Sequence, residues 1–162
     1  MRKQVSVLFV CIGNICRSPT GEAVFKSLVT KEGLSDKIRV DSAGSSDYHI
    51  GEGPNKHSAQ SASKRGYKLD GRARQYSSRD FEDFDYILGM DASNEVHLRA
   101  LAPDGFKTQI ISFIDLCPTY KDRFNDVPDP YYGGIDGFDL VLDVVEEGCE
   151  NLLKKIRQDH NL

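Results

Sequence analysis

The sequence lacks any apolar stretch long enough to span a bilayer. Internal repeats and low-complexity tracts are also absent. The apolar run after Met1 is short, is interrupted at Ser6 and is closed by a turn at Gly13-Asn14, so it does not resemble a secretory signal peptide. We therefore expect no membrane insertion and a cytoplasmic location.

Basic residues are not in excess. The 21 Lys and Arg stand against 25 Asp and Glu, which gives a formal net charge of -4. This balance argues against a general affinity for nucleic acid or for anionic membranes. A chain of this kind that binds an anion must concentrate positive potential locally.

Histidine and cysteine are scarce. The histidines are scattered without metal-ligand spacing, and no acidic cluster indicates a pair of metal ions, so we expect no metal and no cofactor. An even number of cysteines would allow two disulfides in a secreted protein. A chain of 162 residues, however, is long enough to form a full core without them. Reduced thiols are therefore the better interpretation.

Short apolar segments alternate with helical patterns along the chain. Apolar residues recur at helical spacing in Pro19–Val29 and again in Phe138–Lys155. The expected strands are Val5–Val10, Ile38–Asp41, Tyr86–Gly89 and Gln109–Ile111. The order predicts one α/β domain over residues 1–162, with a doubly wound, central four-stranded parallel sheet flanked by helices.

Two loop-rich segments interrupt this pattern. Ser42–Asn55 is rich in Gly and Ser, and Asp115–Gly137 is rich in Pro and Gly. Long loops inside a compact domain are usually functional. Ligands of doubly wound sheets bind beyond the carboxyl ends of the strands, so the loop after the first strand is the expected place for a site.

The most informative motif follows that strand. Residues Cys11–Pro19 read C-I-G-N-I-C-R-S-P, a C-x5-R spacing that ends in a helix start. Gly13 allows a positive φ, and Ser18-Pro19 suits the N-cap and first position of a helix. Backbone N–H groups and the helix dipole there favour an anion and a thiolate, and the Arg17 guanidinium can hold two oxygens of an oxyanion. This combination predicts a phosphatase; the alternative is a tight turn with an ordinary buried cysteine.

The same loop resembles the phosphate-binding loop of the low-molecular-weight protein tyrosine phosphatase family. A second block, D-P-Y-Y at Asp129–Tyr132, resembles the general-acid loop of that family. Blocks between them also match in order and separation: Val40–Gly44, Ala73–Gln75 and Asp85–Asp91. The resemblance covers about Val5 to about Leu153. It implies a flavodoxin-like fold with both loop-rich segments near the mouth of the site.

The resemblance implies hydrolysis of phosphotyrosine in proteins, and of small aryl phosphates, through a phosphocysteine intermediate. Cys11 would be the nucleophile, Arg17 and the loop amides would bind phosphate, and Asp129 would be the general acid and then the general base. The implied partners are phosphotyrosine-containing proteins, with inorganic phosphate or vanadate as inhibitors. The residues implied to bind substrate are Ile12, Gly13, Asn14, Ile15, Cys16, Ser18, Tyr48, Tyr131 and Tyr132.

Two supporting features also follow from the resemblance. Ser18 would donate to the cysteine sulfur, and Asn14, in a left-handed conformation, would fix the shape of the loop together with Ser42. Animal members often carry a histidine where this chain has Gly71, so we expect the support of Asn14 to differ here.

Three acidic residues compete for the role of general acid. Asp122 and Asp126 lie in the same loop as Asp129 and are competing candidates. A loop that is acidic and rich in proline is also commonly just solvated, without a catalytic role. The D-P-Y-Y match favours Asp129, and prolines on both sides of it would restrict the backbone and aim the carboxyl group.

The cysteines fall into two groups. Cys16 lies in the same short loop as Cys11, which favours a reversible disulfide that protects the nucleophile, although Cys16 could also be a packing residue. Cys117 and Cys149 are expected to be structural.

Three other functions use a similar loop. Protein-arginine phosphatases of this family carry Thr where this chain has Ile15, and a bulky Ile15 favours phosphotyrosine. Arsenate reductases of this fold need two further cysteines close together, and Gly89 stands where one would be expected. A non-catalytic phosphate-binding module would need neither Cys11 nor Asp129.

Overall fold

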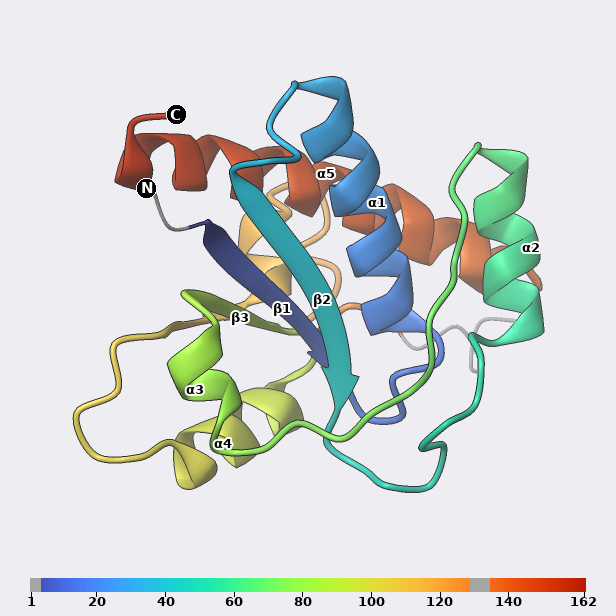
Figure 1. Cartoon of the computed structure of the whole chain (residues 1–162). Helices are drawn as coiled ribbons and strands as arrows, with labels where there is room; N and C mark the ends of the chain where they lie inside the picture. The colour runs from blue at the N-terminus through green and yellow to red at the C-terminus, as the bar shows by residue number, and fades with distance from the viewer. Residues whose placement is uncertain (1–3, 129–134) are drawn as a thin grey trace.

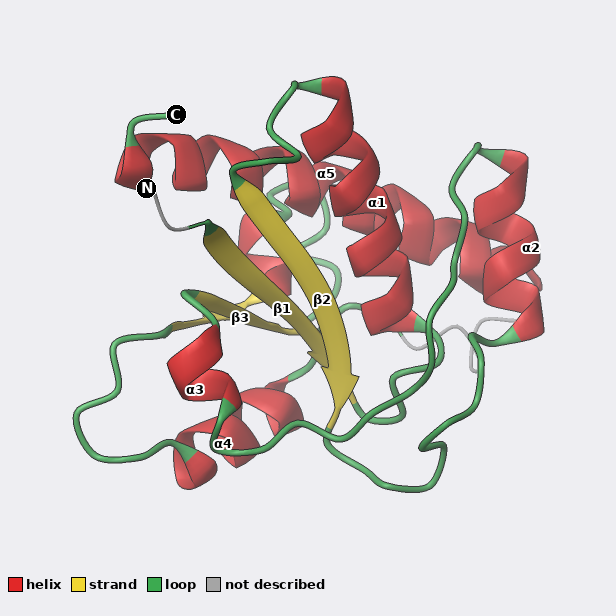
Figure 2. Ribbon diagram, in the orientation of Figure 1, coloured by secondary structure: helices red, strands yellow, loops and turns green. Residues whose placement is uncertain are grey.

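The computed structural model describes residues 4–128 and 135–162 of the chain. Its centre is a four-stranded parallel sheet with the strand order β2-β1-β3-β4 (Figure 2). The strands are β1 (Val5–Cys11), β2 (Ile38–Gly44), β3 (Tyr86–Gly89) and β4 (Gln109–Ser112). The predicted α/β class and all four predicted strands are confirmed, and β2 continues past Asp41 to Gly44.

Helices cover both faces of the sheet (Figure 1). The helices α1 (Arg17–Lys31) and α5 (Ile135–His160) pack together on one face, and α2 (Lys56–Lys64) packs against α5. The short α3 (Asp80–Asp83) and α4 (Ala92–Leu101) lie on the other face, and a 3-10 turn over Phe113–Leu116 follows β4. No helix in residues 4–128 and 135–162 has the length and apolarity needed to cross a membrane.

The central strand β1 explains why its sequence shows no polar alternation. All seven of its residues are buried. Phe9 packs with α1 and α5, and its ring centroid lies 5.9 Å from that of Phe25 in α1. Leu8 and Val10 point to the opposite face, in the cluster that includes Leu98 of α4. Two apolar faces therefore place β1 in the middle of the molecule, with its carboxyl end fixed.

The strand order creates the site. From β1 the chain crosses to β2 on one side, and later to β3 on the other side of β1. The loops after β1 and β3 therefore lead to helices on opposite faces, and a crevice opens between them at the carboxyl ends of the strands. Cys11, the last residue of β1, pairs with Gly44 at this edge.

Candidate active site

The loop after β1 is anchored by the segment that follows β2. The carbonyl of Cys11 accepts a hydrogen bond from the Ser45 backbone N–H at 3.0 Å, and that of Ile12 accepts one from Ser46 at 2.9 Å. These bonds orient the loop carbonyls toward the neighbouring segment. The loop amides are then the donors available for an anion at the N-terminus of α1.

The left-handed residue of the loop is Asn14 rather than Gly13. Asn14 has a φ of 56°, as predicted, and is buried. Gly13 is not among the described glycines with a positive φ, so the loop does not use the conformational freedom that Gly13 allows. Glycine at this position instead leaves room for a neighbouring side chain, because a Cβ atom at Gly13 would lie 3.0 Å from Cδ2 of His49.

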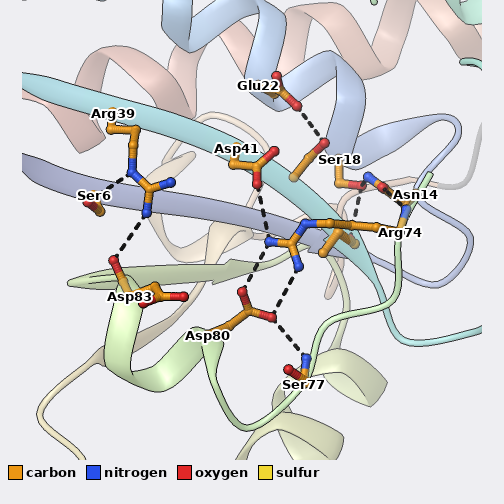
Figure 3. Close-up of polar contacts among 12 residues, drawn as sticks. Ser6, Asn14, Ser18, Glu22, Arg39, Asp41, Arg74, Ser77, Asp80 and Asp83 are labelled. Carbon is orange, nitrogen blue, oxygen red and sulfur yellow. Dashed lines mark hydrogen bonds and ion pairs between the residues drawn. The ribbon is translucent and has the colours of Figure 1, made fainter. Parts of the chain in front are cut away.

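The thiol of Cys11 lies against the Ser18 hydroxyl, with 3.0 Å between Sγ and Oγ. Asn14 Nδ2 donates to the same hydroxyl at 2.9 Å (Figure 3). Since the Ser18 oxygen accepts from Asn14, its own proton is left for Cys11 Sγ or for the more distant Ala43 carbonyl at 3.4 Å. The hydroxyl is therefore placed to donate to a thiolate.

This arrangement corrects one prediction for Ser18. Helix α1 begins at Arg17, with Cys16 in the N-cap position and no side-chain capping bond. Ser18 and Pro19 therefore lie inside the first turn, and the prediction of Ser18 as N-cap is wrong. The hydroxyl is used by the thiol and by Asn14 instead.

Arg17 is a buried residue with a buried partner. Only 6% of it is exposed. Its Nη2 lies 3.1 Å from Asp91 Oδ2, and its Nη1 donates to the Val127 carbonyl at 3.2 Å. Asp91 also caps α4 through a bond from the Asn94 N–H. Arg17 is therefore not part of a solvent-exposed ion pair, and its guanidinium is held beside the loop by protein groups.

A cavity of about 200 Å³ opens over the thiol. Tyr48 stands at its edge with 88% of its surface exposed, and His49, which the sequence did not single out, lies beside it. The lining residues are Cys11, Ile12, Gly13, Ile15, Cys16, Arg17, Ser46, Tyr48 and His49. Most of the predicted loop residues thus share one pocket with Tyr48, while Asn14 and Ser18 bond each other beneath the thiol.

Ser42 has a different partner from the one expected. Its hydroxyl donates to Glu22 Oε1 at 2.6 Å rather than to Asn14. The Asn14 Oδ1 atom accepts instead from the backbone N–H of Arg74 at 3.0 Å. Gly71 has a φ of +86°, and a Cβ atom added there would have no neighbour among the described residues within 4 Å, apart from the adjacent residues of the chain. In this chain a main-chain group, the Arg74 N–H, therefore supports the Asn14 side chain, and the expected difference from animal members stays a prediction.

The remaining cysteines behave as predicted. Burial raises the pKa of Cys117 to about 12, and its thiol donates to the Val144 carbonyl at 3.3 Å. Burial also raises the pKa of Cys149 well above its ordinary value. These are inert core thiols. Cys11 and Cys16 are both buried cysteines of the loop.

The proposed acid loop is only partly within the described residues. Asp129, Tyr131 and Tyr132 lie outside them. Of the two competing acids, Asp126 accepts a hydrogen bond from the Ala92 N–H at 2.8 Å, at the first turn of α4, and Asp122 is exposed. Asp126 therefore has a structural partner, which weakens its case as the acid.

Comparisons with known proteins identify the family of the chain. The low molecular weight protein-tyrosine-phosphatase YfkJ of Bacillus subtilis is 45% identical over 161 residues, covering 98% of this chain and 99% of that protein. A protein tyrosine phosphatase from Entamoeba histolytica, solved with Hepes in the active site, matches with a TM-score of 0.91 at 42% identity. This match covers 96% of this chain and 99% of the other.

A Drosophila arginine phosphatase is also similar, with a TM-score of 0.85 at 37% identity, covering 93% of this chain and 97% of that one. The sequence model for low molecular weight phosphotyrosine protein phosphatases matches residues 6–162. The chain therefore belongs to the low molecular weight phosphotyrosine protein phosphatase family and is a phosphotyrosine phosphatase.

Proposed function

We propose that this chain hydrolyses phosphotyrosine in proteins through a phosphocysteine intermediate formed on Cys11. The observation that carries the proposal is the position of Cys11 Sγ, which lines a cavity with Arg17 and touches the Ser18 hydroxyl at 3.0 Å. A phosphate in this cavity would meet the nucleophile, a guanidinium and the amides of one loop together.

In the first step, the thiolate of Cys11 attacks phosphorus and the bond from phosphorus to the aryl oxygen breaks. The Arg17 guanidinium and the loop amides from Ile12 to Ser18 hold the three equatorial oxygens while charge moves onto the leaving oxygen. Asp129 donates a proton to that oxygen, so the product leaves as a neutral phenol.

In the second step, water attacks the phosphocysteine and the phosphorus–sulfur bond breaks. The Asp129 carboxylate takes the proton from water, and inorganic phosphate is released. The Ser18 hydroxyl donates to the departing sulfur, which stabilises the thiolate as a leaving group. The same contact thus helps both the attack and the departure of Cys11.

Pocket walls account for the choice of an aryl phosphate. Tyr48 and Ile15 line the described part of the cavity. By the family resemblance, we expect Tyr131 and Tyr132 to provide further walls. The bulky Ile15 lacks the hydroxyl that the resemblance associates with phosphoarginine, so it favours phosphotyrosine over the substrate of an arginine phosphatase.

A comparison of four substrates tests the proposed function. We expect rapid turnover of an aryl phosphate and a phosphotyrosine peptide, and little turnover of phosphoserine and phosphoarginine peptides, both with and without chelator. The phosphoserine side chain is shorter than that of phosphotyrosine, so we expect its phosphate to reach the loop less well. Faster hydrolysis of phosphoarginine than of phosphotyrosine would support the alternative function, and loss of activity with chelator would contradict a cysteine mechanism without metal.

A thiolate nucleophile requires a reducing compartment, and we propose the cytoplasm as the place of action.

Mild peroxide should oxidise Cys11 to a sulfenic acid, and attack by the Cys16 thiol would then release water and form a disulfide. We expect reversible loss of activity, restored by a dithiol. Peptide mapping checks the Cys11–Cys16 link, and finding only sulfinic acid at Cys11 would contradict it. Cys16→Ser should lose the reversibility.

A further inference from the structure

The backbone of Arg74 holds the phosphate loop from behind. Its N–H donates to Asn14 Oδ1 at 3.0 Å (Figure 3). Its carbonyl accepts from the Gly44 N–H at 2.8 Å. Gly44 in turn lies directly against the phosphate loop, because a Cβ atom at Gly44 would lie 2.7 Å from the Ile12 carbonyl oxygen. The position of Arg74 therefore determines where the Asn14 side chain can be held.

The side chain of Arg74 is in turn clamped by two carboxylates from different elements. Asp80 in α3 receives both guanidinium nitrogens, Nη2 at 3.1 Å and Nη1 at 3.3 Å, and Asp41 in β2 lies 3.2 Å from Nη2. Burial alone would lower the pKa of Arg74, but the hydrogen bonds and charges of Asp80 and Asp41 outweigh it and raise the pKa. Arg74 therefore stays charged and paired.

Asp80 is the fixed end of this clamp. Its side chain is only 7% exposed, and it also accepts the Ser77 N–H at 2.9 Å. The guanidinium is its paired cation, and a buried carboxylate without one would be strongly unfavourable. A two-point contact to an anchored carboxylate restricts the Arg74 side chain and the main chain that carries it.

We propose that Asp80 and Arg74 are positioning residues for the Cys11 thiolate. Asp80 fixes Arg74, the Arg74 N–H fixes Asn14, and Asn14 directs the proton of Ser18 onto the sulfur. The inference rests on the proposed function of Cys11. It adds to that function a support that begins in α3, on the face of the sheet opposite α1.

The test is Asp80→Asn, which removes the charge but leaves an oxygen for Ser77 and no unpaired buried carboxylate. If the Asn14 side chain is held less firmly, the Ser18 hydroxyl should donate a weaker hydrogen bond to the Cys11 thiolate. The thiolate is then less stable, so the pH midpoint for alkylation of Cys11 by iodoacetamide should rise by about half a unit to one unit. For an aryl phosphate, kcat should fall about 3- to 10-fold while KM changes less than about 2-fold, since coupled contacts have energies of this order. Phosphate binding by Arg17 should remain.

The matched control is Asp143→Asn. Arg65 is also held by two carboxylates, Asp143 at 2.9 Å and Glu146 at 2.5 Å, on α5. Neutralising Asp143 should leave the alkylation profile and kcat unchanged. If Asp80→Asn does not fold, Asp41→Asn releases the exposed end of the same clamp and should shift the profile in the same direction by less.

A double-mutant cycle separates a relay from a general loosening. In a Ser18→Ala background, Asp80→Asn should cause no further shift in the alkylation midpoint. An equal shift there, or none in the single variant, would overturn the inference. If wild-type Cys11 is not selectively alkylated with loss of turnover, the proposed function fails instead, so the two failures are distinguishable.

Discussion

Replacing Cys11 with serine is expected to abolish turnover of aryl phosphates while the fold is retained. The exchange is nearly isosteric at a position that is 3% exposed. A serine hydroxyl is not ionised in this loop, so the nucleophile is lost. The expected loss in kcat is about 10⁴-fold or more, the size seen when an enzyme loses its nucleophile. Initial rates on an aryl phosphate, with circular dichroism to verify the fold, measure it.

The same variant should still bind inorganic phosphate, because Arg17 and the loop amides are unchanged. Calorimetry with phosphate tests this part separately. In the wild-type chain, phosphate should protect Cys11 from iodoacetate. Substantial activity in folded Cys11→Ser protein would reject the phosphocysteine mechanism, whereas failure of phosphate to protect the thiol would reject the loop as the anion site.

The fold and the loop could be predicted because their signals are local. The buried run of β1 and the C-x5-R spacing lie within one short stretch of sequence. The alternation of strands and helices then determines the sheet class. These features depend little on distant residues, and the structure confirms the class, all four strands and the left-handed Asn14.

The partners of the loop could not be predicted because they depend on tertiary structure. Asp91 pairs with Arg17 only because β3 lies beside β1. Arg74 lies in the matching block Ala73–Gln75, and Asp80 lies five residues after that block. No spacing rule shows that the Arg74 backbone donates to Asn14. Local preference predicts Ser18 as an N-cap. The thiol and Asn14 override that preference, since they bond its hydroxyl.

Removal of the proposed general acid has the second largest expected effect. Asp129→Ala should lower kcat for a phenyl phosphate by about 10²- to 10⁴-fold, the usual contribution of general acid–base catalysis. Asp129 lies outside the described residues, so the prediction depends on the D-P-Y-Y motif and on the chemistry of the leaving group. Expelling a phenolate whose conjugate acid has a pKa of about 10 requires a proton donor.

A series of aryl phosphates with increasingly acidic phenols distinguishes catalysis from structure. The loss in Asp129→Ala should shrink as the phenol becomes more acidic, because a better leaving group needs less proton donation. Phosphate binding should change little. Asp122→Ala is the matched control, since Asp122 is exposed in the same region and should leave kcat unchanged. Equal losses across the series would make Asp129 structural. The acid would then be sought at Asp126, whose carboxylate already holds the first turn of α4.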